Sequence, residues 1–426
     1  MSGLTRRGLI GAGIATLAPA LLSPAFLSRG GLAAPSDLSA EFSPADAPPR
    51  AFHARLQPAP PRQLFGESLD RADSNSPVLR DGERTLAFVS SFQPIGQTYR
   101  RQGPGSGFLG LGPMQPVEIV DPHAEGRWDD GKWIESVWRH PGGRLYGWYH
   151  AEISVPTSRA VPKIGALASD DDGLTWRMLG DLFDVSPEDA DSDFQNGYFL
   201  GGLGDFCALV SRADGHVYIY ATAYGPGEDR QGIVAARYPL SSLDNPRDGL
   251  EIWQGAWGWR AADGERPHPT PILRPSREWR HADPDAFWGP AIHFNTSLRA
   301  YVMLVNRTAA GFGDWRQDGI YVSFNERLDD PLGWSPPQRL VAGGAWYPQV
   351  VGIGPGEGDT LAGATARFFL AGYSAWEIVF SEADGAAEWP ASLEMDRDLN
   401  VVRAQVSERR SDGAVGTPAA KKSRHR

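Results

Sequence analysis

The sequence predicts an all-β fold built from repeated sheet units, and three observations carry this prediction. The chain of 426 residues is rich in turn-forming and aromatic residues, with 50 Gly, 35 Pro and 15 Trp. It contains no long apolar pattern with the 3.6-residue period of an amphipathic helix. Three stretches, starting at Leu145, Val217 and Tyr301, each read as an apolar strand, a polar connection, a second strand and a turn closed by Trp. Repeats longer than about 40 residues with about four strands each are typical of β-propeller blades.

The first 34 residues are interpreted as an export signal and not as part of the fold. Arg6 and Arg7 precede a mildly apolar run, and the small residues at 31–34 offer a cleavage site. This layout is typical of the twin-arginine pathway, with an ordinary secretory signal or an uncleaved anchor as alternatives. Residues 35–62 contain seven prolines and few aliphatic side chains, so we expect a linker there. We therefore expect a protein exported to the periplasm or beyond, without a stable membrane span.

The repeats are expected to occupy residues 63–405, because apolar runs recur there on both sides of short turns. Asp-Gly and Gly-Gly pairs between such runs are strong hairpin signals. A first strand, its turn and a second strand are expected at 73–91, 133–151, 204–224, 288–307 and 346–373. We predict a five-bladed β-propeller, with six blades as the alternative, and a disordered polar tail at 406–426.

Net charge and cysteine content exclude some classes of function. The formal net charge of −11 argues against a nucleic-acid partner, because binding phosphates requires a basic surface. Cys207 is the only cysteine, so no intramolecular disulfide forms. It lies in an apolar run, and we interpret it as a small buried hydrophobic residue and not as a nucleophile.

One turn carries a recognisable motif. Residues 169–176 match the pattern Ser-x-Asp-x-Gly-x-x-Trp, the Asp-box, at every fixed position. The motif resembles the turns of sialidases and related propellers. In such a turn the Asp171 carboxylate caps backbone amides, while Trp176 packs between sheets. We therefore interpret this motif as structural.

Polar and aromatic residues are expected to gather where the first strands of the units begin. In a propeller, this strand usually lines the central channel, and its start faces the funnel where ligands sit. Several carboxylates brought close together repel one another, so a group of them at one mouth indicates function. The residues at the five starts are Asp73 and Asn75, Glu135, Asp205, Trp288 and His293, and Tyr347 and Gln349.

Asp73, Glu135 and Asp205 are the candidate catalytic residues. Glycoside hydrolysis needs one protonated carboxyl to donate to the leaving oxygen, and one ionised carboxylate to activate water or attack the sugar. We expect Asp73 to act as base or nucleophile, Glu135 as acid or pKa tuner, and Asp205 as the partner acid. Glu152 is an alternative acid. In the competing structural interpretation, Asp73 caps a turn and Asp205 anchors the backbone after a run of glycines.

A second set of residues is expected to bind the substrate. His150 and Glu152 are two apart in one strand and point to the same face, where they can act together on a ligand or a metal. Trp288 offers a stacking surface for a sugar ring. No motif with strong metal-ligand spacing occurs, so neither a metal nor a cofactor is predicted. The predicted substrate-binding residues are Asn75, His150, Glu152, Asp285, Trp288, His293, Tyr347 and Gln349.

Several phrases together resemble exported bacterial propeller proteins described as sialidase-like or glycosidase-like. The phrases stand at 196–199, 204–206, 288–295, 319–324 and 346–350. The order of the acids is similar to that of five-bladed glycosidases, in which an Asp base, a tuning acid and a Glu acid come from the first three blades. This chain departs from that pattern, because Asp205 stands where those families carry Glu.

The sequence thus favours a secreted, monomeric hydrolase that cleaves a glycosidic bond of an oligo- or polysaccharide. A non-catalytic glycan-binding propeller is one alternative. A sialidase-like enzyme is another, with Tyr347 as nucleophile and three arginines on the substrate carboxylate. Candidates for these arginines, by location only, are Arg139, Arg237, Arg307 and Arg367. The third alternative is a different enzyme, such as a lyase or a metal-dependent hydrolase, that uses His150, His281 and His293.

Overall fold

The computed structural model divides the chain into two compact units, 1–45 and 46–426, and every described residue belongs to the second. The predicted export signal, residues 35–49, the phrase at 196–199 and the predicted tail lie outside the described residues. No helix in the described part of the chain is long and apolar enough to cross a membrane. The described residues are 50–82, 84–105, 110–121, 129–153, 161–183, 201–225, 227–263, 268–279, 281, 283–308, 316–383, 393–395 and 401–404.

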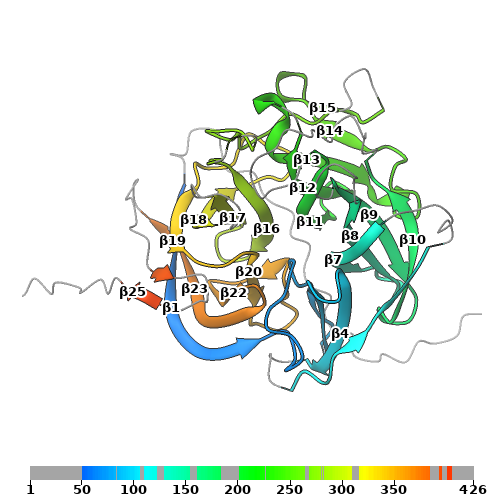
Figure 1. Ribbon diagram of the computed structural model, residues 1–426, viewed down its shortest axis with the longest axis vertical. Helices are drawn as coiled ribbons and strands as arrows, with labels where there is room; N and C mark the ends of the chain where they lie inside the picture. Colours follow the sequence, from blue (N-terminus) through cyan, green and yellow to red (C-terminus); the bar gives the residue numbers. More distant parts are fainter. Residues whose placement is uncertain are drawn as a thin grey trace, which may run out of the picture. The chain divides into compact units, whose positions relative to one another are not determined.

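Strands dominate the described residues, with only three short 3-10 helices between them (Figure 1), and the all-β prediction is confirmed. The strands form five sheets. In the order in which the strands pair, the smallest sheet is β2 (Val78–Arg80), β3 (Arg84–Ser91), β4 (Gln97–Pro104) and β5 (Gln115–Pro116). The next is β6 (Glu118–Val120), β10 (Thr175–Asp181), β9 (Val161–Ser169), β8 (Leu145–Ile153) and β7 (Asp129–Arg139). The third is β11 (Leu203–Ser211), β12 (His216–Tyr224), β13 (Gln231–Pro239), β14 (Glu251–Trp253) and β15 (Trp259–Ala261).

The remaining two sheets lie later in the chain. The fourth is β21 (Leu361–Ala362), β16 (Phe287–Asn295), β17 (Ala300–Thr308), β18 (Gln317–Asn325), β19 (Gln338–Gly343), β24 (Leu393–Met395) and β25 (Val401–Ala404). The fifth is β1 (Ala51–Gln63), β23 (Tyr373–Ala383), β22 (Thr365–Leu370) and β20 (Pro348–Gly352). The 3-10 helices are η2 (Glu228–Arg230), η3 (Leu240–Ser242) and η4 (Gly255–Trp257).

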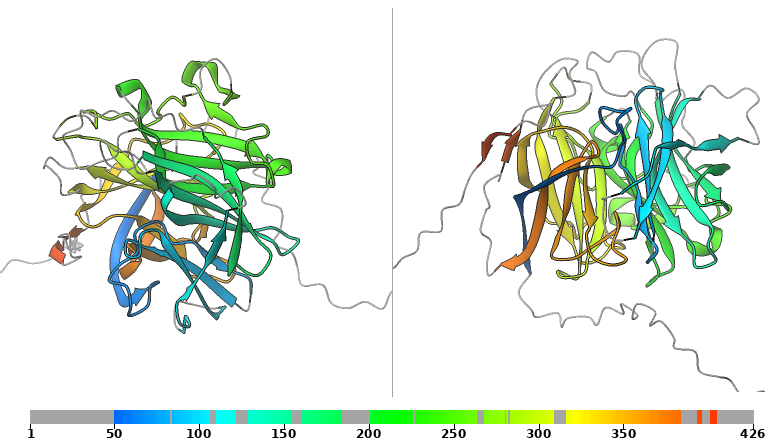
Figure 2. Two further views of the ribbon diagram at one scale, coloured as in Figure 1. Left: turned by 45° about the vertical axis from the view of Figure 1, so that its right-hand side comes forward. Right: turned by 90° about the horizontal axis from the view of Figure 1, so that it is seen from below.

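The number of blades differs from the prediction. Among the described residues, four sheets contain at least three strands of five or more residues, and these four are full blades. The sheet of β2 to β5 has only two such strands, because β2 is three residues long and β5 two. The structure therefore shows four blades in a propeller-like ring, not five or six, together with one smaller sheet (Figures 1 and 2).

The sheets succeed one another around a centre, and their first strands are neighbours. Strand β7 contacts β3 and β11, β11 contacts β16, and β16 contacts β20. The ring is joined between β20 and the start of β2, where the Gln349 side chain accepts a hydrogen bond from the Ser76 N–H and donates one to the Ser76 carbonyl. Asn75 reaches across the centre and donates to the carbonyls of Phe206 and Pro290, which belong to two other sheets.

Strand β1 corrects the predicted linker. Residues 51–62 are part of β1, which pairs antiparallel with β23 from Ala51 opposite Ala383 to Gln63 opposite Tyr373 (Figure 2). The first described strand thus completes the last sheet of the ring. Prolines are tolerated there because β1 is an edge strand, and an edge strand leaves one side of its backbone without ladder partners.

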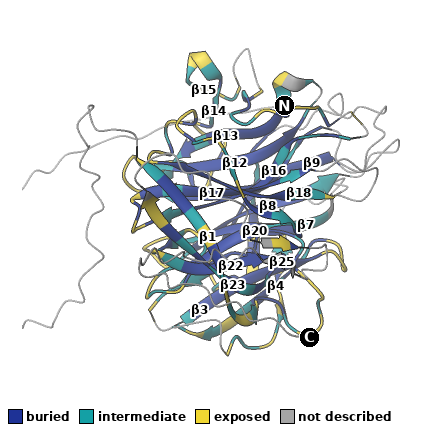
Figure 3. Cartoon of the chain, turned by 90° about the vertical axis from the view of Figure 1, so that its left-hand side faces the viewer, coloured by how far each residue is buried: buried dark blue, intermediate teal, exposed yellow. Residues whose placement is uncertain are grey.

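The core lies between neighbouring sheets, because most strands bury side chains on both faces (Figure 3). One example is the layer between the smallest sheet and its neighbour, where Phe88 of β3 meets Trp176 of β10 edge-on at 5.7 Å between ring centroids. The turn before Trp176 is held by Asp171, which accepts hydrogen bonds from the N–H groups of Leu174 and Thr175. This turn therefore has a structural role in the packing of two sheets.

Candidate active site

Three first strands are irregular at the same end of the ring. Strand β7 has a β-bulge between Ile134 and Ser136, which places Glu135, and β11 has one between Gly204 and Phe206, which places Asp205. The register of β16 shifts just after Trp288. A bulge re-aims a side chain at the expense of regular pairing, and bulges are frequent beside active sites. We call this end of the first strands the acidic end.

Glu135 is enclosed completely, since its side chain is 0% exposed. One carboxylate oxygen accepts a hydrogen bond from the Phe206 N–H at 3.0 Å, and the other lies 3.2 Å from Nδ1 of His150 on β8. Burial raises the pKa of Glu135 to about 8, against a smaller lowering by the Phe206 N–H. Gly204 leaves room for the imidazole, because a Cβ there would lie 3.0 Å from His150 Nε2.

Asp205 is the second enclosed acid, at 2% exposure. Its carboxylate accepts hydrogen bonds from the hydroxyls of Tyr224 and Tyr347. Burial raises the pKa of Asp205 to about 6, while His150 lowers it and the charge of Glu135 raises it. Asp205 also has a left-handed backbone, with φ of 40°, which costs energy for a residue with a side chain.

Asp73 precedes β2 and is the partly exposed acid of the three. The indole N–H of Trp133 donates to its carboxylate at 3.0 Å. Burial raises the pKa of Asp73 to about 7; the Trp133 hydrogen bond opposes this rise, and the charges of Asp205 and Glu135 add to it. The structure thus brings together the three acids that the sequence singled out, from three different sheets.

Aromatic side chains lie beside the acids. Tyr347 precedes β20, has a φ of 53° and meets Trp288 edge-on at 5.9 Å between centroids. Tyr224 and Trp279 pack in the same cluster. Trp288 is 1% exposed, so the sugar-stacking surface expected of it is not available in this conformation. Five non-glycine residues among those described have positive φ, and two of them, Asp205 and Tyr347, are hydrogen-bonded to each other here.

Other predicted binding residues are placed differently. The amides of Asn75 and Gln349 are buried and hold the centre of the ring together through backbone hydrogen bonds. Asp285 forms a two-pronged ion pair with Arg307 at 2.7 and 2.9 Å. His293 lies on β16, five residues after Trp288, and is buried against Phe380. Burial lowers the pKa of His293 to about 3.

Glu152 stays a prediction as a substrate-binding residue. It is partly exposed and lies two residues after His150 on β8, opposite Gly131 and Pro162. Sequence reasoning missed Trp133 and Tyr224 as partners of the acids. Trp133 stands two residues before Glu135, but nothing in the sequence shows that its indole turns towards Asp73. Tyr224 ends the strand paired with β11, and only that pairing brings it to Asp205.

One group in the described part of the chain has the side chains to hold a metal ion. Ligand atoms of Glu135, His150 and Asp205 all lie within 4.8 Å of one another. Two carboxylates and an imidazole suit a divalent cation such as zinc or manganese. The other predicted histidines do not join this group: His293 faces Phe380, and His281 is exposed.

The four candidate arginines of a sialidase site are engaged elsewhere. Arg139 pairs with Asp172, Arg237 with Glu251 and Arg307 with Asp285, each at 2.7 to 2.8 Å. Arg367 donates to the carbonyls of Pro60 and Ser374. None of these four arginines therefore pairs with the three acids in the described structure.

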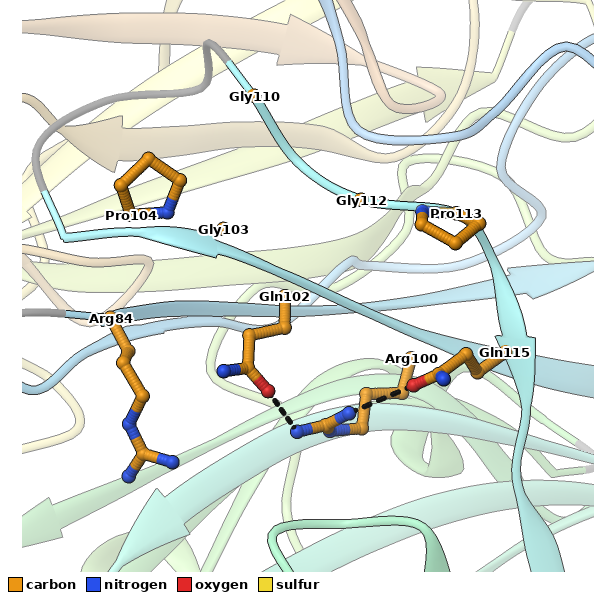
Figure 4. A pocket seen from close by; sticks show the side chains of 9 residues that line it. All are labelled: Arg84, Arg100, Gln102, Gly103, Pro104, Gly110, Gly112, Pro113 and Gln115. Carbon is orange, nitrogen blue, oxygen red and sulfur yellow. Dashed lines mark hydrogen bonds between the residues drawn. The ribbon is translucent and has the colours of Figure 1, made fainter.

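A separate pocket of about 560 Å³ lies along the smallest sheet (Figure 4). The guanidinium of Arg100 donates there to the side-chain oxygens of Gln102 and Gln115 at 2.6 and 3.0 Å. Its third contact is the Asp172 carbonyl at 2.8 Å. None of the predicted site residues lines this pocket.

No family model matches this sequence, and no curated protein matches it. Solved structures with some similarity include a variant exo-β-1,3-galactanase from Phanerochaete chrysosporium, with 10% identity and a TM-score of 0.43 over 78% of this chain and 64% of that one. The present chain thus spans less than two thirds of that galactanase. A native arabinanase from Bacillus subtilis has 12% identity and a TM-score of 0.40, over 76% of this chain and 98% of its own. An α-L-arabinanase from Penicillium chrysogenum has 14% identity and a TM-score of 0.43, over 74% and 80%.

Proposed function

We propose that this chain is a hydrolase that cleaves a glycosidic bond of a neutral oligo- or polysaccharide at the acidic end. One observation carries the proposal. Asp73, Glu135 and Asp205 come from three sheets, converge at one place, and two of them sit on strands whose pairing is interrupted by bulges. Burial and like-charge repulsion make such a group of acids energetically unfavourable. Acid/base chemistry at this site would explain why the protein keeps the group.

The burial of each acid favours particular roles. Asp73 is partly exposed and has the weaker hydrogen bonding, so in this proposal it is the general acid that gives its proton to the glycosidic oxygen as the C–O bond breaks. Asp205, held ionised by two tyrosine hydroxyls, takes a proton from the water whose oxygen bonds to the anomeric carbon. Glu135 and Asp205 are equally enclosed, each at 2% exposure, but both oxygens of Glu135 have a partner, the Phe206 N–H and His150; in this proposal Glu135 therefore acts through His150 as a positioning residue. This reverses the base role expected of Asp73 from the sequence.

The charges around the acids bear on the substrate. None of the four candidate arginines pairs with the acids, while the charge of Arg71 opposes the rise that burial causes in the pKa of Asp73. The side chains beside the acids include Trp133, Tyr224, Trp288 and Tyr347. An uncharged sugar fits these surroundings, whereas an anionic sugar would be repelled by the carboxylates. The proposal therefore favours neutral sugars over sialic acids as substrates.

Two further parts of the sequence interpretation, the export and the oligomeric state, remain proposals. The proposal of export by the twin-arginine pathway rests on Arg6 and Arg7. The proposal that a signal of 34 residues is cleaved rests on the small residues at 31–34. A monomer is the proposed state.

The test is to incubate the purified full chain with five neutral polysaccharides, arabinan, xylan, galactan, glucan and mannan, and to measure the sugar released from each. Release of sugar, lost in Asp205→Asn at an unchanged unfolding temperature, is the expected result. Asp359→Asn is the matched control, because burial also raises the pKa of Asp359 to about 7, but this acid lies near Val78, away from the other three. No release from any polymer, with glycans still retained on an array, would instead identify a binding module.

A metal-dependent hydrolase is the second candidate, favoured by the proximity of Glu135, His150 and Asp205. Chelation separates the two. Acid/base hydrolysis by Asp73 and Asp205 continues after dialysis against EDTA, whereas a metal-dependent reaction stops and returns with zinc or manganese.

A further inference from the structure

The connection between β3 and β4 exposes two large apolar side chains. Phe92 is 61% exposed and Ile95 51%, and both lie on the short turn 92–96. Single exposed apolar residues are common on protein surfaces, but two on one turn form a small apolar surface. We call residues 92–96 the apolar tip.

The apolar tip is fixed to the body of the protein. The Ser91 hydroxyl donates to the carbonyls of Pro94 and Gln97, and the Gly96 N–H donates to the Ser91 carbonyl. Gly96 also rests directly on β7, since a Cβ there would lie 2.2 Å from the Lys132 nitrogen. Gly96 also has a φ of 64°. This position therefore requires glycine both for its backbone conformation and for its close contact with β7.

The apolar tip borders the candidate active site on two sides. On one side, the Asp73 N–H donates to the carbonyl of Ser90, two residues before Phe92, at 2.9 Å. On the other, Ile95 packs over Gly131, where a Cβ would meet Ile95 Cγ2 at 2.8 Å and the Trp133 ring at 2.9 Å. Trp133 is the residue that donates to Asp73. The apolar tip is therefore linked to Asp73, the most exposed of the three acids, through Ser90 on one side and through Gly131 and Trp133 on the other.

We propose that the apolar tip binds the sugar unit on the leaving-group side of the bond to be cleaved, with Phe92 stacked on the C–H face of that unit. The inference rests on the proposed function and adds a preference for chains over single sugars. It follows from position, because a sugar whose glycosidic oxygen receives the proton of Asp73 has its next unit beside that acid. Aromatic rings bind the apolar faces of sugars well.

The test compares Phe92→Ala with the parent on two substrates of one sugar: an oligosaccharide of six units and the methyl glycoside, whose leaving group is too small to stack on Phe92. We expect KM for the hexasaccharide to rise about 3- to 10-fold, with KM for the small glycoside unchanged within about 2-fold. Phe92→Trp, which keeps an aromatic ring at this position, should have the same KM for the hexasaccharide as the parent. Leu332→Ala, which removes a side chain that is 65% exposed in the loop between β18 and β19, changes neither.

Equal effects of Phe92→Ala on both substrates, or none on the hexasaccharide, would overturn the inference. A failure of the proposed function is distinguishable from this result, because no variant then hydrolyses anything. In that case the dissociation constants of hexasaccharides from the same five polysaccharides are measured by calorimetry. A loss of affinity on Phe92→Ala would keep the apolar tip as a binding site, and an unchanged affinity would reject it.

Discussion

Strands β11 and β12 carry a tyrosine–aspartate pair at each end, and the two pairs have different surroundings. At one end the Tyr218 hydroxyl donates to Asp214 in the hairpin turn, where the Asp214 side chain is 36% exposed beside His216. At the acidic end the Tyr224 hydroxyl donates to Asp205, which is enclosed at 2% exposure. The chemical groups are the same, and only their positions in the ring differ.

The two pairs show how the fold gives the same chemical groups different surroundings. Asp214 lies partly exposed in the hairpin turn. Asp205 is 2% exposed, shares its space with Glu135 and His150, and sits on a bulge with positive φ. Burial raises the pKa of Asp205, and His150 and the tyrosine hydroxyls oppose this rise.

The largest expected difference between the two ends is in catalysis. Asp205→Asn should lower kcat/KM by about 100- to 10,000-fold, because the amide cannot accept a proton from water. Asp214→Asn should leave kcat/KM within about 2-fold of the parent. Both are measured on the polysaccharide hydrolysed best, together with thermal unfolding. Similar losses in both variants would refute the assignment of Asp205.

The hydroxyl groups give the next effect. Tyr224→Phe removes a hydrogen bond to the ionised form of Asp205, which raises the pKa of Asp205. The acidic limb of the activity profile should then move up by about one pH unit. Tyr218→Phe should leave that limb in place. The parent profile is expected to peak between about pH 6 and 7, where Asp205 is ionised and Asp73 is protonated. A peak well outside this range, or equal shifts in both variants, would contradict the roles proposed.

Stability should depend on pH in the direction set by the raised pKa values. Glu135 holds its proton up to about pH 8 in the folded state, whereas an unfolded Glu releases it near pH 4. The folded state therefore binds more protons between these values, and stability falls as pH rises through them. Glu135→Gln should reduce the fall in unfolding temperature between pH 5 and 8 by about 2 to 4 °C. Asp214→Asn, the control, should leave the fall in unfolding temperature as large as in the parent. If Glu135→Gln shows the same fall as the parent, burial of Glu135 is not its cause.

The smallest effect is expected in the Asp-box turn. Asp171→Ala removes an acceptor for two backbone N–H groups and should cost about 1 kcal/mol of unfolding free energy, with kcat and KM unchanged. Asp170→Ala, in the same turn, removes only an exposed ion pair with Arg144 and should cost less than about 0.5 kcal/mol. A loss of activity in Asp171→Ala without a loss of stability would give the turn a role in the reaction.

Local patterns predicted the strands well where the partner strand follows a short turn. The runs predicted to start at Leu145, Val217 and Tyr301 are β8, β12 and β17, whose first residues agree with the prediction to within one residue, because alternation and turn residues are local signals. The prediction failed at β1, whose prolines read as a linker and whose pairing partner β23 lies more than 300 residues away. It also failed on the number of blades, since the smallest sheet repeats the turn signals of a blade but its strands β2 and β5 are only three and two residues long.

Spacing along the chain was enough to predict the all-β class and to name the three acids as candidates. The folded arrangement was needed to show which acid is exposed, which residues donate hydrogen bonds to it and which predicted binding residues are buried. Trp133, Tyr224 and Tyr347 reach the acids from three different sheets. Burial and hydrogen bonds between sheets depend on distances in space, and these are fixed only when the ring is formed.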